Sequence, residues 1–372
     1  EYIALFPELV DGVTPRVPVA KPSELWLSGL ERVVLNSNSN FMNVGERCNV
    51  AGSRKFLRLI NEKNYAEALK IARKQVEDGA QVLDINMDDG LLDVRAEMVN
   101  FLNLLAGEPE IARLPLMVDS SDWEVIRAGL KCIQGRAIVN SISLKEGEAL
   151  FVQRAIEAKR LGAVVVVMAF DEEGQATTYQ KRTQVCQRAY HLLTEKLQFS
   201  PQDIVFDPNV LTIATGMPEH NSYGVDFIET VRYIKQNLPH AKVSGGISNL
   251  SFAFRGNNVV REAMHSVFLY HAIQAGLDMA IVNPAQLQIY SQIEPTLLAK
   301  VEAVILNTHP NATDQLIAYA KTLQNTETVG KAEQTDLWRS ASVQDRLVHA
   351  LMHGITEYIE QDVNEALQTY RP

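Results

Sequence analysis

Leu114-Pro-Leu-Met-Val-Asp-Ser-Ser121 and Arg136-Ala-Ile-Val-Asn-Ser-Ile-Ser143 are two consecutive apolar runs that each end in a polar side chain followed by serine. Both runs have the composition of buried strands, and Asp119 and Asn140 stand at the same point of each run. If the two strands are parallel neighbours, we expect Asp119 and Asn140 to lie side by side. The rest of the chain repeats this pattern, and the repetition decides the fold.

Six further apolar runs alternate with segments of helical spacing. The eight runs end at Glu46, Asp84, Asp119, Asn140, Phe170, Asp207, Asn249 and Asn283. Apolar strands that alternate with helices indicate a parallel sheet covered on both faces. Eight such units without a break predict an α/β fold, a closed (β/α)8 TIM barrel, in which the polar strand ends collect at one mouth. At any single position Asp or Asn could instead be a helix N-cap, but the pattern recurs on six of the eight strands.

Two segments flank the predicted barrel, which we place at residues 31–326. Residues 1–30 are rich in proline and lack sustained periodicity, which indicates a linker and a cover for the bottom of the barrel. Residues 327–372 begin as a polar linker and continue with helical apolar spacing at Val343, Leu347 and Leu351. That apolar stripe needs a partner, so we expect a C-terminal helical extension cut from a longer protein.

Composition and charge exclude several classes of partner. The 372-residue chain has a formal net charge of −10 and a pI near 5.4, which disfavours nucleic acid and anionic membranes. Its 3 cysteines are widely spaced, so we expect neither a disulfide framework nor a metal site, and a reducing, cytoplasmic location. No run of 18 apolar residues and no signal-peptide pattern is present.

The predicted mouth is rich in carboxylates and amides and has neither an arginine cluster nor a phosphate-type glycine loop. Such a pocket suits a neutral heterocycle with many hydrogen-bonding groups. A carboxylate can accept a pair of hydrogen bonds from an amino group and an adjacent ring N–H, and pterins present that edge. Asp119 and Asp207 are the candidates for this contact, and Asn140 and Asn249 are candidates for other polar atoms of the ring.

Six motifs together resemble one known family. They are NVGERCNVAGS (43–53), LDINMDD (83–89), MVDSS (117–121), VNSIS (139–143), FDPN (206–209) and GGISNLSF (245–252). In consistent order over roughly residues 30–325, they resemble the folate-binding barrel of cobalamin-dependent methionine synthases. That barrel is related to corrinoid-linked methyltetrahydrofolate methyltransferases and, more distantly, to dihydropteroate synthases. Residues 347–367 resemble the opening of the helical cap that in this family precedes the cobalamin domain.

The resemblance implies a methyltransferase half-reaction. The barrel would bind 5-methyltetrahydrofolate and present its N5-methyl group to cob(I)alamin, giving methylcobalamin and tetrahydrofolate for methionine synthesis from homocysteine. Asp119, Asn140 and Asp207 match the pterin-binding positions, and Asn249 matches the asparagine that reaches N5. The family also has an arginine after that asparagine, and Arg255 is the nearest one here. Cobalamin would be bound by a partner domain, and zinc by a homocysteine domain, both outside this chain.

Asn249 is the catalytic candidate because a methyl group leaves a tertiary amine poorly unless N5 is protonated. A neutral asparagine can accept a hydrogen bond from protonated N5 without the desolvation cost of a carboxylate. Two alternatives stay open. In the first, the chain is only a folate-binding and docking module without turnover; in the second, it is a pterin enzyme of the dihydropteroate synthase type. A dihydropteroate synthase would have a T-P-D-S-F run after strand one and a basic anion site after strand eight. This chain has GERCN at the first position and NPAQ at the second, which disfavours that alternative.

Overall fold

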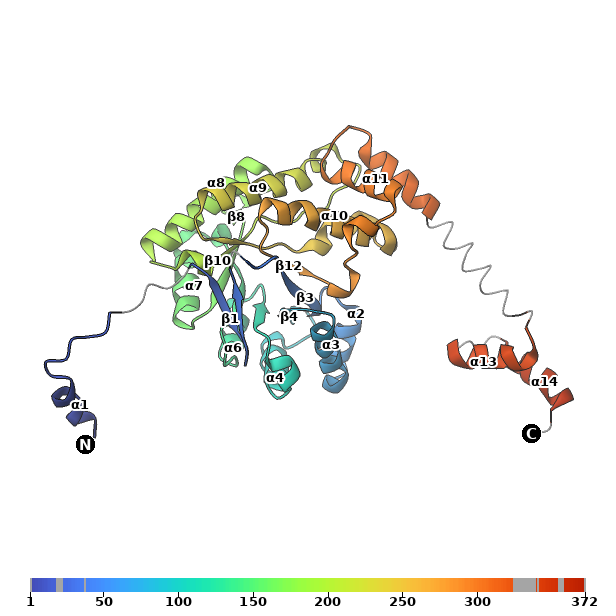
Figure 1. Ribbon diagram of the computed structural model, residues 1–372, viewed down its shortest axis with the longest axis horizontal. Helices are drawn as coiled ribbons and strands as arrows, with labels where there is room; N and C mark the ends of the chain where they lie inside the picture. Colours follow the sequence, from blue (N-terminus) through green and yellow to red (C-terminus); the bar gives the residue numbers. More distant parts are fainter. Residues whose placement is uncertain are drawn as a thin grey trace.

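The computed structural model describes residues 2–17, 23–36, 38–323, 339, 341–353 and 358–370. Its centre is an 8-stranded parallel sheet in the order β11-β10-β7-β6-β5-β4-β3-β12. The strands are β3 (Met42–Asn49), β4 (Val82–Asn86), β5 (Leu116–Asp119), β6 (Ile138–Ile142), β7 (Val164–Met168), β10 (Ile204–Asp207), β11 (Lys242–Val243) and β12 (Met279–Val282). A parallel bridge between Gly246 and Ile281 joins β11 to β12 and closes the sheet. The predicted α/β barrel is therefore confirmed (Figure 1).

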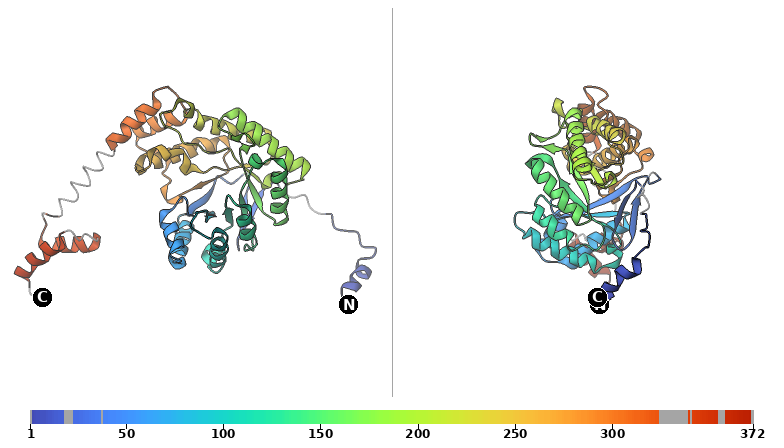
Figure 2. Two further views of the ribbon diagram at one scale, coloured as in Figure 1. Left: turned by 180° about the vertical axis from the view of Figure 1, so that it is seen from behind. Right: turned by 90° about the vertical axis from the view of Figure 1, so that its left-hand side faces the viewer.

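Helices cover the outside of the barrel (Figures 1 and 2). They are α2 (Arg54–Asn61), α3 (Tyr65–Glu77), α4 (Val94–Ala106), α5 (Pro109–Ala112), α6 (Trp123–Leu130), α7 (Glu148–Arg160), α8 (Tyr179–His191), α9 (Tyr223–Asn237), α10 (Asn258–Ala275) and α11 (Pro295–Ile305), followed by a helix over 312–323. Ser53, Asn64, Asp93 and Thr178 each accept a hydrogen bond from a backbone N–H of the helix that follows. These side-chain caps satisfy first-turn donors and fix where the helices begin.

Side chains along each strand alternate between two apolar cores. Inside the barrel, Val44, Val82, Met117, Ile138 and Val205 belong to one buried cluster. The residues between them face the helices and belong to a second, larger cluster. Because the side-chain period of a strand is two, the next inward positions toward the mouth are Glu46, Asp84, Asp119, Asn140 and Asp207.

A hairpin of β1 (Leu25–Ser28) and β2 (Arg32–Leu35) covers the lower end of the barrel. Leu25, Leu27 and Leu35 are buried and belong to the inner cluster, so the hairpin plugs that end with apolar side chains. The predicted domain boundary at residue 30 falls in the turn of this hairpin. Before it, α1 (Tyr2–Val10) forms in the segment predicted to be a linker.

Three strand ends differ from the sequence-based expectation. β3 continues past Glu46 to Asn49 through a register shift between Gly45 and Cys48. Phe170 lies in a short hairpin of β8 (Phe170–Asp171) and β9 (Gly174–Gln175), beyond the end of β7. Strand seven has only two residues, and Asn249 lies beyond it in the 3-10 helix η5 (Ile247–Phe254).

The C-terminal residues form the expected helices. α13 (Val343–His353) and α14 (Ile359–Thr369) lie together and apart from the barrel helices in Figure 1. Buried Asp362 pairs with Arg339 and, at 3.0 Å, with Arg346. Leu351 of the predicted apolar stripe is exposed, and so are Val363 and Leu367 on α14. None of the described helices has the length and apolar character needed to cross a membrane.

Candidate functional site at the barrel mouth

Asp119 and Asn140 lie side by side at the mouth, as the sequence predicted. They are register partners on adjacent parallel strands, and the backbone oxygen of Asn140 accepts a 3.1 Å hydrogen bond from Ser120 N–H. Both side chains point inward, because each follows an inward apolar residue by two positions. Asp119 is partly exposed, while Asn140 is buried beside it. A ligand in the mouth therefore meets a carboxylate and an amide together.

A second carboxyl group, Asp84, lies against Asp119. The Asn49 Nδ2 lies 3.4 Å from Asp84 Oδ2 and 3.5 Å from Asp119 Oδ2, so one amide spans both acids. Burial raises the pKa of Asp84 well above its usual value, and the charge of Asp119 raises it further. Burial also raises the pKa of Asp119 to about 7, although a hydrogen bond from Asn86 opposes the rise. The two carboxyl groups therefore resist being ionised together.

Asp207 faces the mouth from β10 and is backed by a buried cation. Burial raises the pKa of Asp207 to about 6, whereas a 2.8 Å hydrogen bond from the Asn209 backbone N–H and the charge of Arg182 hold it down. Arg182 is fully buried and donates to the backbone oxygens of Asn209 at 3.0 Å and Tyr223 at 3.3 Å. Its pKa is lowered by burial to about 10. The guanidinium fixes the loop after β10, and hence the position of Asp207.

Asp88 ties two mouth loops together. Its carboxylate accepts hydrogen bonds from Ser120 Oγ at 2.6 Å, from Ser121 N–H at 2.6 Å and from Ser121 Oγ at 2.8 Å. The backbone N–H of Asp88 in turn donates to Asn86 Oδ1 at 2.8 Å. The serines that follow Asp119 therefore hold the loop after β5 on the loop after β4.

The sequence placed Glu46 among the strand ends at the mouth but gave it no role there. Ser248 Oγ lies 2.8 and 2.9 Å from the two carboxylate oxygens of Glu46, although the residues are 202 positions apart. Burial raises the pKa of Glu46, and the charges of Arg47 and Arg261 oppose the rise. Only the strand alternation Met42, Val44, Glu46 could have shown that this side chain points inward.

Arg261 is held by a buried hydrogen-bond chain. Its Nε donates to Ser251 Oγ at 3.0 Å, and Ser251 Oγ lies 2.7 Å from His265 Nε2. Burial and the charge of Arg261 lower the pKa of His265 to about 4, so the imidazole is neutral at pH 7. Ser251 then donates to His265 and accepts from Arg261. The signal in the sequence was weak, because no spacing distinguishes Arg261 from an ordinary helix-surface arginine.

Asn249 and Arg255 lie on η5 and directly after it, at the rim. Asn249 is exposed, and its backbone oxygen accepts a 2.9 Å hydrogen bond from Thr212 Oγ1. Arg255 is exposed too, with its guanidinium carbon 4.3 Å from the centroid of the Phe252 ring. Within the described residues Arg255 makes no hydrogen bond to Asp119, Asn140 or Asp207. The structure thus groups those three residues in the mouth, with Asn249 and Arg255 further out.

A basic groove of about 400 Å³ is lined by residues of β3, α2 and α3 and by the segment that follows β12. Its charged lining residues are the bases Arg47, Lys55, Lys70 and Lys74 and the acids Glu67 and Asp78. Asn283, directly after β12, also lines it. Lys70 pairs with Glu67 at 2.5 Å and Lys74 with Asp78 at 2.6 Å. Arg47 and Lys55 form no ion pair within the described residues. The groove therefore has two basic side chains without a close ion-pair partner among the described residues.

The site has the chemistry to hold an uncharged, hydrogen-bonding ring. Its carboxyl groups are poorly solvated, and Asp84 Oδ1 has no hydrogen-bond partner among the described residues. Such acceptors gain from N–H donors more than acceptors in water do. Across the described part of the chain no three His, Cys, Asp or Glu side chains are grouped so that they could hold a metal ion.

Residues 45–283 match the model of one protein family, described as pterin binding enzyme. Among solved structures, the dihydropteroate synthase of Xanthomonas albilineans with 4-aminobenzoic acid is 13% identical, with a TM-score of 0.49 over 77% of this chain and 98% of that chain. The dihydropteroate synthase of Yersinia pestis with a pterine-sulfa conjugate is 14% identical, with a TM-score of 0.47 over 76% and 99%. Both structural likenesses are too distant to indicate a function.

Proposed function

The chain belongs to the family of pterin-binding enzymes, and from this premise we propose that its mouth binds the pterin ring of a folate through Asp119, Asn140 and Asp207. The observation that carries the proposal is the register pairing of Asp119 with Asn140, both turned into the mouth. An ionised Asp119 accepts two hydrogen bonds from the 2-amino group and N3–H of the ring. Asn140 beside it supplies a donor and an acceptor for the remaining ring atoms.

The reaction that we propose is transfer of the N5-methyl group of 5-methyltetrahydrofolate to cob(I)alamin, which acts as a co-substrate. The bond between N5 and the methyl carbon breaks, and its electron pair stays on the protonated nitrogen, which becomes neutral, while the nucleophilic co-substrate supplies the electron pair for its new bond to the methyl carbon. Asn249 is exposed at the rim, and its side-chain amide makes no hydrogen bond within the described residues, so its oxygen is free to accept from protonated N5–H. In this proposal the barrel supplies orientation, and the co-substrate supplies the nucleophile.

Stopped-flow measurement of cobalamin absorbance at saturating methyltetrahydrofolate tests the reaction. We expect Asn249→Ala to slow methyl transfer by about tenfold to a hundredfold, with little change in the folate Kd, because the lost hydrogen bond forms mainly with the activated substrate. Asn61→Ala, an exposed amide on α2, is the matched control. A wild-type chain that binds the folate but transfers no methyl group is a binding module only. A variant that transfers at the wild-type rate removes Asn249 from the mechanism.

A second candidate function, a condensation like that of dihydropteroate synthase, is favoured by the basic groove. The residues after strand eight contribute no base, but β3, α2 and α3 bring Arg47, Lys55, Lys70 and Lys74 beside Asn283. This groove offers the anion site that such an enzyme needs for an acidic leaving group. The same groove also suits the carboxylates of a folate tail, so its charge alone does not decide between the two reactions.

The product distinguishes the two functions. The chain is incubated with 4-aminobenzoate and a dihydropterin carrying a diphosphate leaving group, and 7,8-dihydropteroate is quantified by mass spectrometry. Our first proposal expects no product above a protein-free control, together with methyl transfer in the cobalamin assay. Catalytic formation of dihydropteroate, lost in the double variant Arg47→Met/Lys55→Met, would establish the second function instead.

A further inference from the structure

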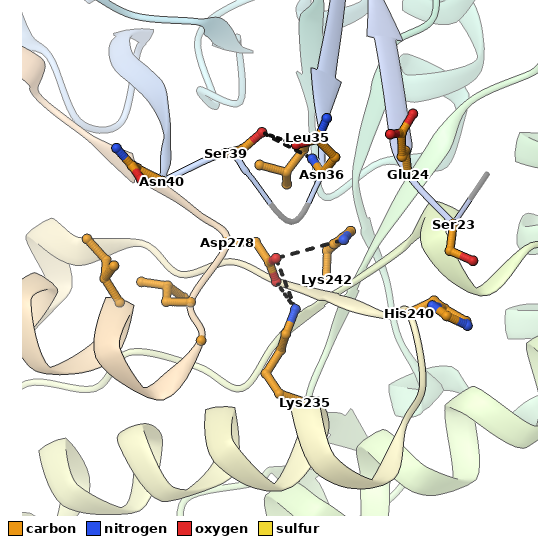
Figure 3. A pocket seen from close by; sticks show the side chains of 13 residues that line it. Ser23, Glu24, Leu35, Asn36, Ser39, Asn40, Lys235, His240, Lys242 and Asp278 are labelled. Atoms are coloured by element: carbon orange, nitrogen blue, oxygen red, sulfur yellow. Dashed lines mark hydrogen bonds and ion pairs between the residues drawn. The ribbon is translucent and has the colours of Figure 1, made fainter.

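A cavity of about 640 Å³ lies at the lower end of the barrel, away from the acidic mouth (Figure 3). Its wall combines the starts of β11 and β12, the end of α9, and the segments that flank the β1–β2 hairpin. Ligand pockets in proteins typically measure roughly 300–1,000 Å³. The lower end of a barrel normally contributes stability and not chemistry, so a polar cavity of this size there needs an explanation.

Lys242 is the residue that makes this cavity unusual. It is the first residue of β11 and pairs in register with Val205, whose side chain lies inside the barrel, so Lys242 also points inward. Only 8% of the residue is exposed. The ammonium group nonetheless donates no hydrogen bond within the described residues. An ammonium group that faces a cavity and donates no hydrogen bond to the protein has its three donors available to a ligand.

Asp278 does not satisfy Lys242. The distance from Lys242 Nζ to Asp278 Oδ1 is 4.0 Å, which is beyond hydrogen-bond range. The same carboxylate already accepts from Lys235 Nζ at 3.0 and 2.9 Å and from the Val243 N–H at 2.8 Å. Figure 3 shows Lys235, Asp278 and Lys242 turned toward one another. Lys242 is the buried member of this group, whereas Asp278 is half-buried and Lys235 is exposed, and the carboxylate is hydrogen-bonded to Lys235 and not to Lys242.

The other polar groups of the cavity include a second carboxylate, Glu24, so the wall holds two lysines and two acids, but none of them accepts a hydrogen bond from Lys242 within the described residues. His240 is exposed at one side, and Asn40 and Ser39 offer amide and hydroxyl donors at the other. Glu24 is the remaining acid of the wall, and its carboxylate already accepts a 2.9 Å hydrogen bond from Trp26 Nε1 on the hairpin. The apolar part of the wall comes from Leu35, Ile273 and Leu277. The cavity thus joins an unsatisfied cation to an apolar surface.

We propose that this cavity binds a small metabolite through an oxyanion group, phosphate or carboxylate, which is seated on the ammonium of Lys242. An oxyanion accepts the three donors that the protein leaves unused, and the carbon skeleton of the metabolite contacts Leu35, Ile273 and Leu277. The site is separate from the mouth and does not depend on which pterin reaction the mouth performs. A water-filled cleft is the competing explanation, and the two differ in whether a specific anion binds with saturation.

Isothermal titration calorimetry of the whole chain in an anion-poor buffer tests the proposal, with inorganic phosphate in one arm and acetate in the other. We expect saturable 1:1 binding of at least one anion, weakened at least tenfold by Lys242→Met and partly kept by Lys242→Arg. Lys131→Met changes an exposed lysine at the same end of the barrel and should bind like the wild type. Binding of 5-methyltetrahydrofolate should be the same in Lys242→Met, which also shows that the variant is folded.

The outcomes separate the explanations. Binding of phosphate alone assigns the site to phosphorylated metabolites, and binding of acetate alone assigns it to carboxylates. Binding that Lys242→Met leaves intact would place the anion elsewhere, for example in the basic groove, and would overturn the proposal. The absence of saturable binding by either anion would leave a water-filled cleft and would overturn it as well.

Discussion

The two ends of this barrel are built from the same strands and carry opposite chemistry. At the mouth, Asp84, Asp119 and Asp207 occupy inward positions, and burial raises the pKa of each. Two residues earlier on the same strands, toward the lower end, the inward residues Val82, Met117 and Val205 form an apolar layer. The comparison teaches that the lower layers supply stability and the upper layer is free for function. It also makes Lys242, the one charged side chain in the lower layer within the described residues, stand out.

Each end holds polar groups whose hydrogen bonds the protein does not complete within the described residues. At the mouth these groups are acceptors, which suit the N–H edge of a neutral ring. At the lower end they are donors on Lys242, which suit an oxyanion. The two proposed ligands therefore follow from one rule, that a buried polar group without a partner is the place where a ligand gains most.

The largest effect is expected from removing the cation that supports the mouth. Arg182→Met would leave Asp207 without its buried counter-charge and two backbone oxygens without a donor. Leaving two buried carbonyl oxygens unpaired costs about 1–3 kcal/mol each, so we expect the free energy of unfolding to fall by about 2–5 kcal/mol. Urea unfolding followed by circular dichroism measures this loss. Arg160→Met, exposed on α7, should change stability by less than about 0.5 kcal/mol; a loss of the same small size in Arg182→Met would contradict the role given to this residue.

The sequence predicted the fold and the core of the candidate site for physical reasons. Apolar strands with a period of two, separated by helices, leave few arrangements besides a barrel, and equal strand ends place Asp119 beside Asn140. The placement of Asn249 at a strand end was wrong, because the chain leaves the sheet after Val243 and turns into η5. Contacts between distant segments, such as Ser248 with Glu46, leave no mark on local spacing.

Two residues had a local signal that could have been used. Arg182 lies on the same helix face as the buried residues Val185, Cys186 and Ala189, so a charge on an apolar stripe marked a buried cation. Lys242 begins a strand whose neighbours are buried, which marked a lysine in the wall of the barrel. Neither signal identifies the residues that surround Arg182 or Lys242, because those neighbours come together only when the barrel closes.

The next effect in size concerns ligand binding at the mouth. Asp119→Asn replaces an acceptor with an amide whose NH2 faces the donors of the pterin edge, so we expect folate affinity to fall by about 1–3 kcal/mol, or roughly fivefold to a hundredfold. Calorimetric titration with 5-methyltetrahydrofolate measures it. Glu46→Gln should weaken binding less, and Asp314→Asn, an exposed acid on the 312–323 helix, should not weaken it. Unchanged affinity in Asp119→Asn would exclude this carboxylate from the site.

A smaller, pH-dependent effect follows from the raised pKa of Asp119, which is about 7. The ring binds the ionised carboxylate, and ionisation is lost as the pH falls through that pKa, so affinity should be about tenfold weaker at pH 6 than at pH 8. Titrations in two buffers of different ionisation enthalpy should also show proton release on binding near pH 7. In Asp119→Asn both effects should disappear; their persistence there would assign the proton to another group.

Without ligand, the same pKa predicts the opposite trend in stability. The folded-state pKa of Asp119 lies above that of the unfolded chain, so between about pH 4 and pH 7 the folded protein binds more protons than the unfolded one. The contribution of Asp119 to the free energy of unfolding should therefore rise as the pH falls from 7 toward 4. Thermal unfolding of wild type and Asp119→Asn over this range should show a flatter profile for the variant, with Asp207 responsible for part of the remaining slope.

The smallest expected effect tests the lower end of the barrel. In an anion-free buffer, Lys242→Met should raise the free energy of unfolding by about 1 kcal/mol, because it removes a poorly solvated ammonium while Asp278 keeps Lys235 and the Val243 N–H. At a phosphate or acetate concentration ten times its Kd, the wild type should gain about 1.4 kcal/mol by linkage and become the more stable of the two. Chemical unfolding of both proteins with and without the anion measures this reversal. A wild type that is already more stable without any anion would mean that Lys242 is a structural partner of Asp278, and only the mouth of the barrel would then remain a proposed ligand site.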